Sequence, residues 1–445
     1  MSWRDTLRPV RMERIALVAP EINSRAMLTE VARSARVELD LPHTTGDGID
    51  EVDRAVEAGV VSGPLVGFVG WTATESLAPL AESLAPLGAA VVPLRSPRGV
   101  EPPTLLSGNR QRSGASRILV DTYGTVPYAD IDPSRIAGLA YMLMFGMMFG
   151  DVGHGAILVV AGLILRSGRI ARLASLRKIW LFVVGAGLVS MLFGALYGEA
   201  FGPTGLVPVL WIEPLSNPVP LLLTGLVIGA GLLAVSYTIG TINRVREGGW
   251  GYALYSRTGI AGSLLFVAVG LGTLGIVGGI TGVVVTAIVL AVVALAFIFI
   301  GLLVDAGGGG TGLIQAVVEL MDTIVRLGSN IVSFARLAAF GLTHAALLSV
   351  VWSGTVALWT PGWTMIAAVL VFVLGNALTF GLEALVAGIQ ALRLEYYELF
   401  SRIFVREGRP FRPWSPSLPA NELDDTSDDS ASTRALSAPT QRTSP

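Results

Sequence analysis

The sequence predicts an α-helical membrane domain of about eight helices, the last two long and tilted, with a small N-terminal α+β domain. The chain has 445 residues and a mean hydropathy of +0.65. Only 14% of its residues are charged, whereas a soluble protein carries about 25%. The deficit lies in residues 136–400, because residues 1–135 are mixed and charged and residues 415–445 are rich in Ser, Pro and Asp.

This uneven composition predicts four parts along the chain. They are a cytosolic head (1–94), a connector (95–135), a membrane ion-translocation domain (136–414) and a disordered tail (415–445). The connector is rich in Pro, Gly, Ser and Arg, which is typical of irregular structure. The tail is polar and lacks the apolar residues that a packed core requires.

Apolar strand patterns alternate with helical spacing in the head. The strand candidates are Arg14–Ala19, Val37–Leu41, Pro64–Trp71 and Ala89–Leu94. Helical spacing occupies Glu21–Arg36, Asp50–Ala58 and Thr74–Leu87. Such alternation indicates a small α+β or α/β unit.

The membrane domain is divided by length, since a helix needs about 20 apolar residues to cross the hydrocarbon. The candidate segments are Ile136–Leu165, Ile179–Ala200, Pro220–Ile242, Thr258–Ile280, Thr281–Val304, Gln315–Trp359 and Gly362–Phe400. The first is too long for one crossing and is interrupted at Gly150–Gly155, so we expect a helical hairpin there and eight helices in total. The last two exceed a perpendicular crossing, so they must tilt or extend beyond the bilayer.

Loop charges predict the orientation in the membrane. The loop at 166–178 holds five positive residues and no acid, and the stretch at 243–257 holds three Arg, so both are expected in the cytoplasm. The loop at 201–217 holds Glu213 and no positive residue, so it is expected outside. With the hairpin, both ends of the chain lie in the cytoplasm; the alternative is one long first helix and an external head. The charged N-terminus lacks an apolar core, so we expect no cleavable signal peptide.

Several functional classes are excluded by composition and motif. The chain has no cysteine, which excludes disulfides and thiolate metal sites. No basic patch with interleaved aromatic residues is present, so no nucleic-acid partner is expected. No phosphate-binding loop, nucleophile elbow or zinc-helix motif occurs, so the chain itself should not hydrolyse nucleotides and needs no cofactor.

Arg336 is the most informative residue, because it lies well inside an apolar segment. A charge at a helix centre costs at least about 2.5–3.5 kcal/mol on insertion scales, so it indicates function. A guanidinium stays protonated and favours deprotonation of a carboxyl group brought beside it. This is the chemistry that an ion-translocating subunit requires. The alternative is a buried Arg–carboxylate pair that only holds two helices together.

Other polar residues accompany Arg336 on the last two long segments. Glu319, Asp322 and His344 share its segment, and Asn376, Glu383, Gln390 and Arg393 follow on the next one. Such a series could line two offset aqueous half-channels. Glu383 and Arg393 could instead form a structural ion pair, and the sequence leaves both interpretations open.

Asp151 and His154 share a helical face in the Gly-rich break. Two ligands without a third do not hold a metal ion, so we expect a structural polar contact and no metal site.

Three segments resemble one known family. Ser333–His344 resembles the S-[YF]-x-R-L-x-A-x-x-L-x-H stretch in the a/I subunit of V-type and archaeal-type rotary ATPases. Phe145–Gly155 is similar to the first membrane hairpin of that family, and Glu383–Gly408 resembles its last helix. The resemblance covers nearly the whole chain except the tail.

The resemblance implies a stator subunit in a prokaryotic cell membrane, with Arg336 facing the carboxylates of a rotating proteolipid ring. Two half-channels then carry H⁺ or Na⁺ to and from that ring, and the peripheral and central stalk subunits are further partners. Glu319, His344, Glu383 and Arg393 match polar positions near the ion path of the family.

One departure from the family concerns the head. The family carries a long coiled-coil hairpin between two α/β lobes, whereas no heptad run separates Val37–Leu41 from Pro64–Trp71 here. We therefore expect a shortened head. The alternative functions are a secondary transporter or channel, for which no internal repeat is found, and a scaffold that has lost transport.

Overall fold

The computed structural model describes residues 9–41, 51–96, 100–105, 114–169, 171–404 and 407–416. The predicted tail therefore lies almost entirely outside the described residues. These residues divide into two compact units, one spanning 107–407 and the other combining 9–106 with the segment that starts at Gly408.

The N-terminal unit is built on a five-stranded antiparallel sheet with the order β2-β4-β1-β5, and β3 pairs with β4. Its strands are β1 (Met12–Pro20), β2 (Val37–Leu39), β3 (Val60–Ser62), β4 (Leu65–Ala73) and β5 (Ala90–Leu94). Its helices are η2 (Glu21–Asn23), α1 (Ser24–Ser34), α2 (Glu51–Glu57), η3 (Thr74–Ser76), α3 (Leu77–Leu84) and η4 (Ala85–Leu87). The predicted α+β class is confirmed, because every strand pair is antiparallel.

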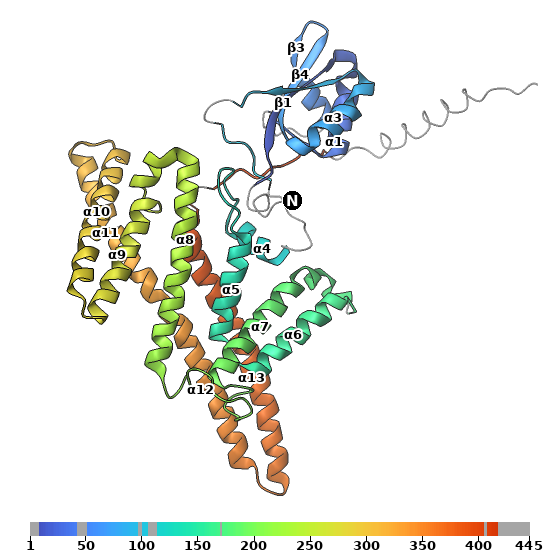
Figure 1. Ribbon diagram of the computed structural model, residues 1–445. Coiled ribbons are helices and arrows are strands. Elements are labelled where there is room, and N and C mark those ends of the chain that lie inside the picture. The colour runs from blue at the N-terminus through green and yellow to red at the C-terminus, as the bar shows by residue number, and fades with distance from the viewer. Residues whose placement is uncertain are drawn as a thin grey trace, which may run out of the picture. The chain divides into compact units, whose positions relative to one another are not determined.

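Alternation along β1 positions the core of this unit. Ile15 and Leu17 are fully buried on one face of the strand, as a period of two requires. Leu28 of α1 and Leu80 of α3 are also fully buried and pack in the same cluster, so these helices cover that face (Figure 1). Strand β3 was not predicted, because its three residues are exposed and carry no alternation.

Residues 408–416 also belong to this unit. Thr104 N–H donates to the carbonyl of Arg409 at 2.6 Å, and Trp414 N–H donates to the carbonyl of Val37 at 2.8 Å. The Arg409 guanidinium lies 3.1 Å from the Glu38 carboxylate. This C-terminal segment thus runs along β2, a strand at the edge of the sheet.

The second unit is helical. Its elements are α4 (Gly114–Tyr123), α5 (Ser134–Met148), α6 (Val152–Ser167), η5 (Ala171–Ile179), α7 (Trp180–Tyr197), α8 (Pro218–Tyr255), α9 (Ile260–Val277), α10 (Thr281–Asp305), α11 (Gly309–Ser333), α12 (Ala335–Leu358), α13 (Trp363–Leu394), the π-helix η6 (Glu395–Phe400) and α14 (Ser401–Ile403). Six helical stretches among the described residues are long and apolar enough to cross a membrane, and α5 and α6 are shorter apolar helices. The predicted multi-pass helical fold is confirmed. Helix α4 lies inside the connector, where no helix was predicted.

The predicted break in the first membrane segment is confirmed. Helix α5 ends at Met148 and α6 begins at Val152. A Cβ atom on Gly155 of α6 would lie 2.7 Å from the carbonyl oxygen of Gly187 on α7, so only glycine allows this approach. Helices α6 and α7 therefore run side by side with their backbones in close contact (Figure 1), as small residues permit in membrane helices.

The predicted long segment Gln315–Trp359 matches one of the six stretches that could cross the membrane, and Phe334 divides it into α11 and α12. The chain bends at Phe334. There, two backbone hydrogen bonds join residues three apart instead of the four of an α-helix: Phe334 N–H to Ile331 O and Leu337 N–H to Phe334 O. The Phe334 side chain is fully buried and packs against Gly229 of α8. The bend has no glycine or proline that would reveal it in the sequence.

A buried ion network joins the end of α8 to the approach to α5. Asp130 and Arg244 are both fully buried, with 3.9 Å between their charged groups, and Arg244 lies 2.8 Å from Glu247. The side-chain carbonyl of Asn243 accepts a hydrogen bond from Ile131 N–H at 3.1 Å. Arg244, expected among the loop charges, is instead a buried residue of α8. Burial, and then the neighbouring Glu247, raise the pKa of Asp130 to about 8.

The bend at Phe334 predicts unequal effects for two glycines of α8. In the Gly229→Ala variant the new Cβ would overlap the Phe334 ring, and such overpacking costs about 1–3 kcal/mol. In the Gly231→Ala control the Cβ enters open space, and alanine favours the helix. Thermal unfolding in detergent should therefore give a lower Tm for Gly229→Ala only. Equal Tm changes in the two variants would contradict this packing.

The raised pKa of Asp130 predicts a dependence of stability on pH. The folded protein holds the Asp130 proton more tightly than the unfolded chain, so this stabilisation is complete at low pH and is lost as the pH rises toward about 8. The Asp130→Asn variant cannot lose that proton. Between about pH 5 and about pH 8 the Tm of the wild-type protein should therefore fall relative to that of the variant, whereas parallel curves would refute the assignment.

Candidate functional site

Arg336 is the second residue of α12, directly after the bend at Phe334. Its side chain is half-buried, and it makes no salt bridge within 4.0 Å among the described residues. The carboxylate within its electrostatic reach is Glu398 of the π-helix, which also interacts with Arg393 and Arg402. The bend therefore presents a guanidinium that no carboxylate of the described residues holds in a close pair.

His344 and Glu383 meet across the antiparallel pair α12 and α13. His344 is buried, and its Nδ1 contacts a carboxylate oxygen of Glu383. His344 lies eight residues beyond Arg336, or about 12 Å along the helix at 1.5 Å per residue. The second carboxylate oxygen of Glu383 and Nε2 of His344 have no hydrogen-bond partner among the described residues. Glu383 is thus paired with His344 and not with Arg393, which is exposed.

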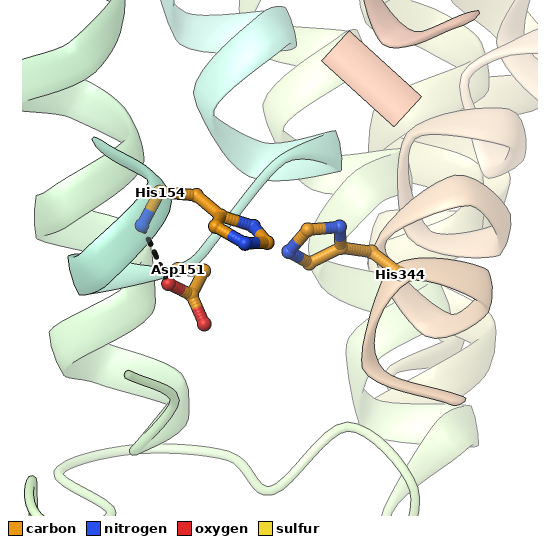
Figure 2. A group of neighbouring side chains, drawn as sticks. All are labelled: Asp151, His154 and His344. Carbon is orange, nitrogen blue, oxygen red and sulfur yellow. Dashed lines mark hydrogen bonds between the residues drawn. The ribbon is translucent and has the colours of Figure 1, made fainter. Parts of the chain in front are cut away.

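Asp151 and His154 lie against His344. Asp151 is the N-cap of α6 and accepts backbone hydrogen bonds from His154 at 2.8 Å and from Phe201 and Gly202 at 3.0 Å each. An aspartate is favoured at this position because its carboxylate satisfies the free N–H groups of the first turn. The rings of His154 and His344 are 5.6 Å apart between centroids and meet in an edge-to-face arrangement at 69° (Figure 2). The hairpin break thereby meets the segment of Arg336.

Of the remaining predicted residues, one joins this group and the others do not. Glu319 is on α11, on the far side of the bend, and pairs with Arg257 at 3.7 Å. Asn376 is buried beside His154, and its Oδ1 has no hydrogen-bond partner among the described residues. Gln390 is half-buried on α13. The structure thus brings together Asp151, His154, His344, Asn376 and Glu383 and leaves Glu319 outside this group.

Glu199 is a buried acid near this group that the sequence analysis missed. It follows the end of α7, and its carbonyl accepts a hydrogen bond from Val152 N–H at 2.9 Å. Burial, and then the nearby charges of Asp151 and Glu213, raise the pKa of Glu199 to about 8. Its position in a loop beside an apolar helix end gave no signal that the carboxyl group is buried.

Comparison with known proteins shows that this chain is similar to subunits of rotary ATPases. The model of the V-type ATPase 116kDa subunit family matches residues 70–207, from β4 to the loop after α7. The "A-type ATP synthase subunit I" of Thermococcus kodakarensis is 25% identical over 322 residues, which are 69% of this chain and 47% of that protein. The protein of the same name from Archaeoglobus fulgidus is 27% identical, over 71% of this chain and 53% of that protein.

A shorter match is stronger in identity. The "V-type ATP synthase subunit I 2" of Treponema pallidum is 39% identical over 83 residues, which are 19% of this chain and 18% of that protein. The chain spans about half the length of the archaeal relatives that it matches. The resemblance predicted from the membrane motifs is thus confirmed: the chain is similar to subunit I of the V-type and archaeal-type ATPases.

Proposed function

We propose that this chain is the stator membrane subunit of a rotary V/A-type ATPase and couples H⁺ or Na⁺ translocation to rotation of a proteolipid ring. One observation carries the proposal: Arg336 stands at the bend between α11 and α12 without a salt bridge within 4.0 Å among the described residues. A charge in an apolar environment requires a partner. We infer that this partner is a carboxylate on another subunit.

The chemistry of such a contact follows from charge alone. A guanidinium remains protonated at any accessible pH, so it stabilises the ionised form of a carboxyl group that comes close. A ring carboxyl that passes Arg336 would therefore release its ion. Once it has moved on into lipid, the same carboxyl would be stable only after it has bound an ion again.

Two acids, one on α13 and one on η6, support an ion path beside Arg336. Glu398 lies within electrostatic reach of Arg336. Glu383 lies fifteen residues before Glu398, about two-thirds of the way from the start of α13 to its end. Its carboxylate contacts His344. The separation provides one acid near the guanidinium and another about two helical turns along α12 from it. Such an offset suits two half-channels that open toward opposite sides.

The proposed partners are a proteolipid ring and the central and peripheral stalk subunits. The names of the relatives state that they are subunits of ATP synthases. The orientation with both chain ends in the cytoplasm and a prokaryotic cell membrane also remain part of the proposal. A secondary transporter or a scaffold without transport would be recognised by failure of the two tests below.

Replacement of Arg336 tests the central step. The Arg336→Ala variant should assemble with the proteolipid ring and lose ATP-driven ion flux in reconstituted vesicles, because no cation remains to discharge the ring carboxyls. The matched control is Arg326→Ala on α11, where an exposed guanidinium lies 2.6 Å from Asp322. That control should retain flux. Flux retained in Arg336→Ala would refute the proposal.

Replacement of Glu383 tests the ion path. The Glu383→Gln variant keeps the size of the side chain but cannot exchange an ion, so we expect ion flux to fall about tenfold or more. A tenfold fall corresponds to an activation barrier that is higher by about 1.4 kcal/mol. The control is Asp305→Asn, at the exposed end of α10. The same vesicle assay measures both variants. Equal flux in the two variants would remove Glu383 from the path.

A further inference from the structure

The two buried histidines of this chain converge on one point. The whole sequence contains three histidines and no cysteine. His154 and His344 are about 190 residues apart in the sequence, yet their rings lie 5.6 Å apart at an interplanar angle of 69°. Both are almost fully buried. The third, His43, lies outside the described residues.

Three nitrogen atoms of these rings remain without a hydrogen bond among the described residues. They are Nδ1 and Nε2 of His154 and Nε2 of His344. An unsatisfied buried polar atom costs about 1–3 kcal/mol, so a pair of rings that leaves three such atoms requires an explanation. Figure 2 shows that the two rings point toward each other and that the Asp151 carboxylate lies beside His154.

His344 supplies the third ligand, which no sequence pattern placed beside Asp151 and His154. One donor atom from each of Asp151, His154 and His344 lies within 4.8 Å of the others. Tetrahedral zinc with bonds of about 2.0–2.1 Å needs donor atoms about 3.4 Å apart, so a metal would shorten the separations between the three donor atoms by at most about 1.4 Å. Two imidazoles and one carboxylate form a donor set that zinc and related divalent metals favour.

The surroundings also suit a metal ion. Glu383 contacts Nδ1 of His344, which directs Nε2 toward His154, and a carboxylate behind a ligating histidine is the usual support in metal sites. The buried side chain of Asn376 lies close enough to His154 to interact with its ring. Asp151 and Glu383 offer two carboxylates, whose negative charges would balance a divalent cation in a medium where net charge is costly.

We propose that Asp151, His154 and His344 form a binding site for a divalent transition metal such as Zn²⁺, with Glu383 as the supporting carboxylate. Because His344 and Glu383 also belong to the proposed ion path, the bound metal would block ion flux. This second statement rests on the proposed function, whereas the binding site itself does not.

Metal binding is tested on the purified full-length chain in detergent, carrying an affinity tag without histidine. Zn²⁺ is titrated by calorimetry, and Co²⁺ is titrated by visible absorption, which reports the number and geometry of nitrogen ligands. We expect one metal ion per chain and a Co²⁺ spectrum typical of tetrahedral coordination. A chain that binds neither ion, or a spectrum without imidazole ligands, would overturn the site.

Variants assign the ligands. His154→Gln and His344→Gln should each weaken Zn²⁺ binding at least tenfold, and Glu383→Gln should weaken it by about tenfold to a hundredfold as a supporting residue. His43→Gln is the matched control and should bind as the wild-type chain does. Circular dichroism checks that each variant is folded. If a variant is not folded, the Co²⁺ spectrum of the wild-type chain decides whether imidazoles bind the metal. Unchanged affinity in both buried variants, or loss in His43→Gln, would overturn the proposal.

A flux assay separates this site from the proposed function. In the assembled complex, Zn²⁺ should inhibit ATP-driven flux over the concentration range in which it binds the chain, and His154→Gln should raise the inhibitory concentration at least tenfold. Binding without inhibition would leave the metal site intact and remove it from the ion path. Inhibition unaffected by His154→Gln would show that Zn²⁺ acts elsewhere and would refute the blocking role.

Discussion

The membrane unit depends on the carboxylate of Asp151, which accepts hydrogen bonds from free backbone N–H groups at the break in the first hairpin. Inside an apolar medium every free N–H or C=O group is costly, so helices rarely stop there. Asp151 accepts three backbone N–H groups from two separate segments. The hydroxyl of Ser190 on α7 donates to the carbonyl of Phe149 on the other side of the break. One acid and one hydroxyl thereby allow the chain to turn and place His154 in the interior.

Close packing between α5, α6 and α7 completes this arrangement. Gly146, Gly155, Gly187 and Gly194 each lie where a Cβ would contact a neighbouring backbone or side chain. Since lipid tails are as apolar as leucine side chains, contact between helices in a membrane is stabilised by such fit and by polar groups. The helix that carries His154 is thus packed against its neighbours through glycines.

Local features of the sequence predicted local structure well and distant contacts poorly. The strands of the head follow from alternation, and the break at Gly150 follows from its glycines. The bend at Phe334 escaped because its cause is a ring packed against Gly229, more than a hundred residues earlier. The approach of His154 to His344 escaped for the same reason, because periodicity shows the face of a helix but not the neighbour opposite it. Arg336 could be recognised as a candidate functional residue from the sequence, because placing a charge inside an apolar membrane helix costs free energy.

The pairing of residues 408–416 with the head has a consequence for biosynthesis. An uncovered edge strand invites pairing with other chains, and here the covering segment comes from beyond the last membrane helix, where Trp414 bonds to Val37. The ribosome makes β2 early and its cover only after the membrane helices. The sheet therefore keeps an open edge until residues 408–416 have been made, and closure of that edge shows that translation has passed the last membrane helix.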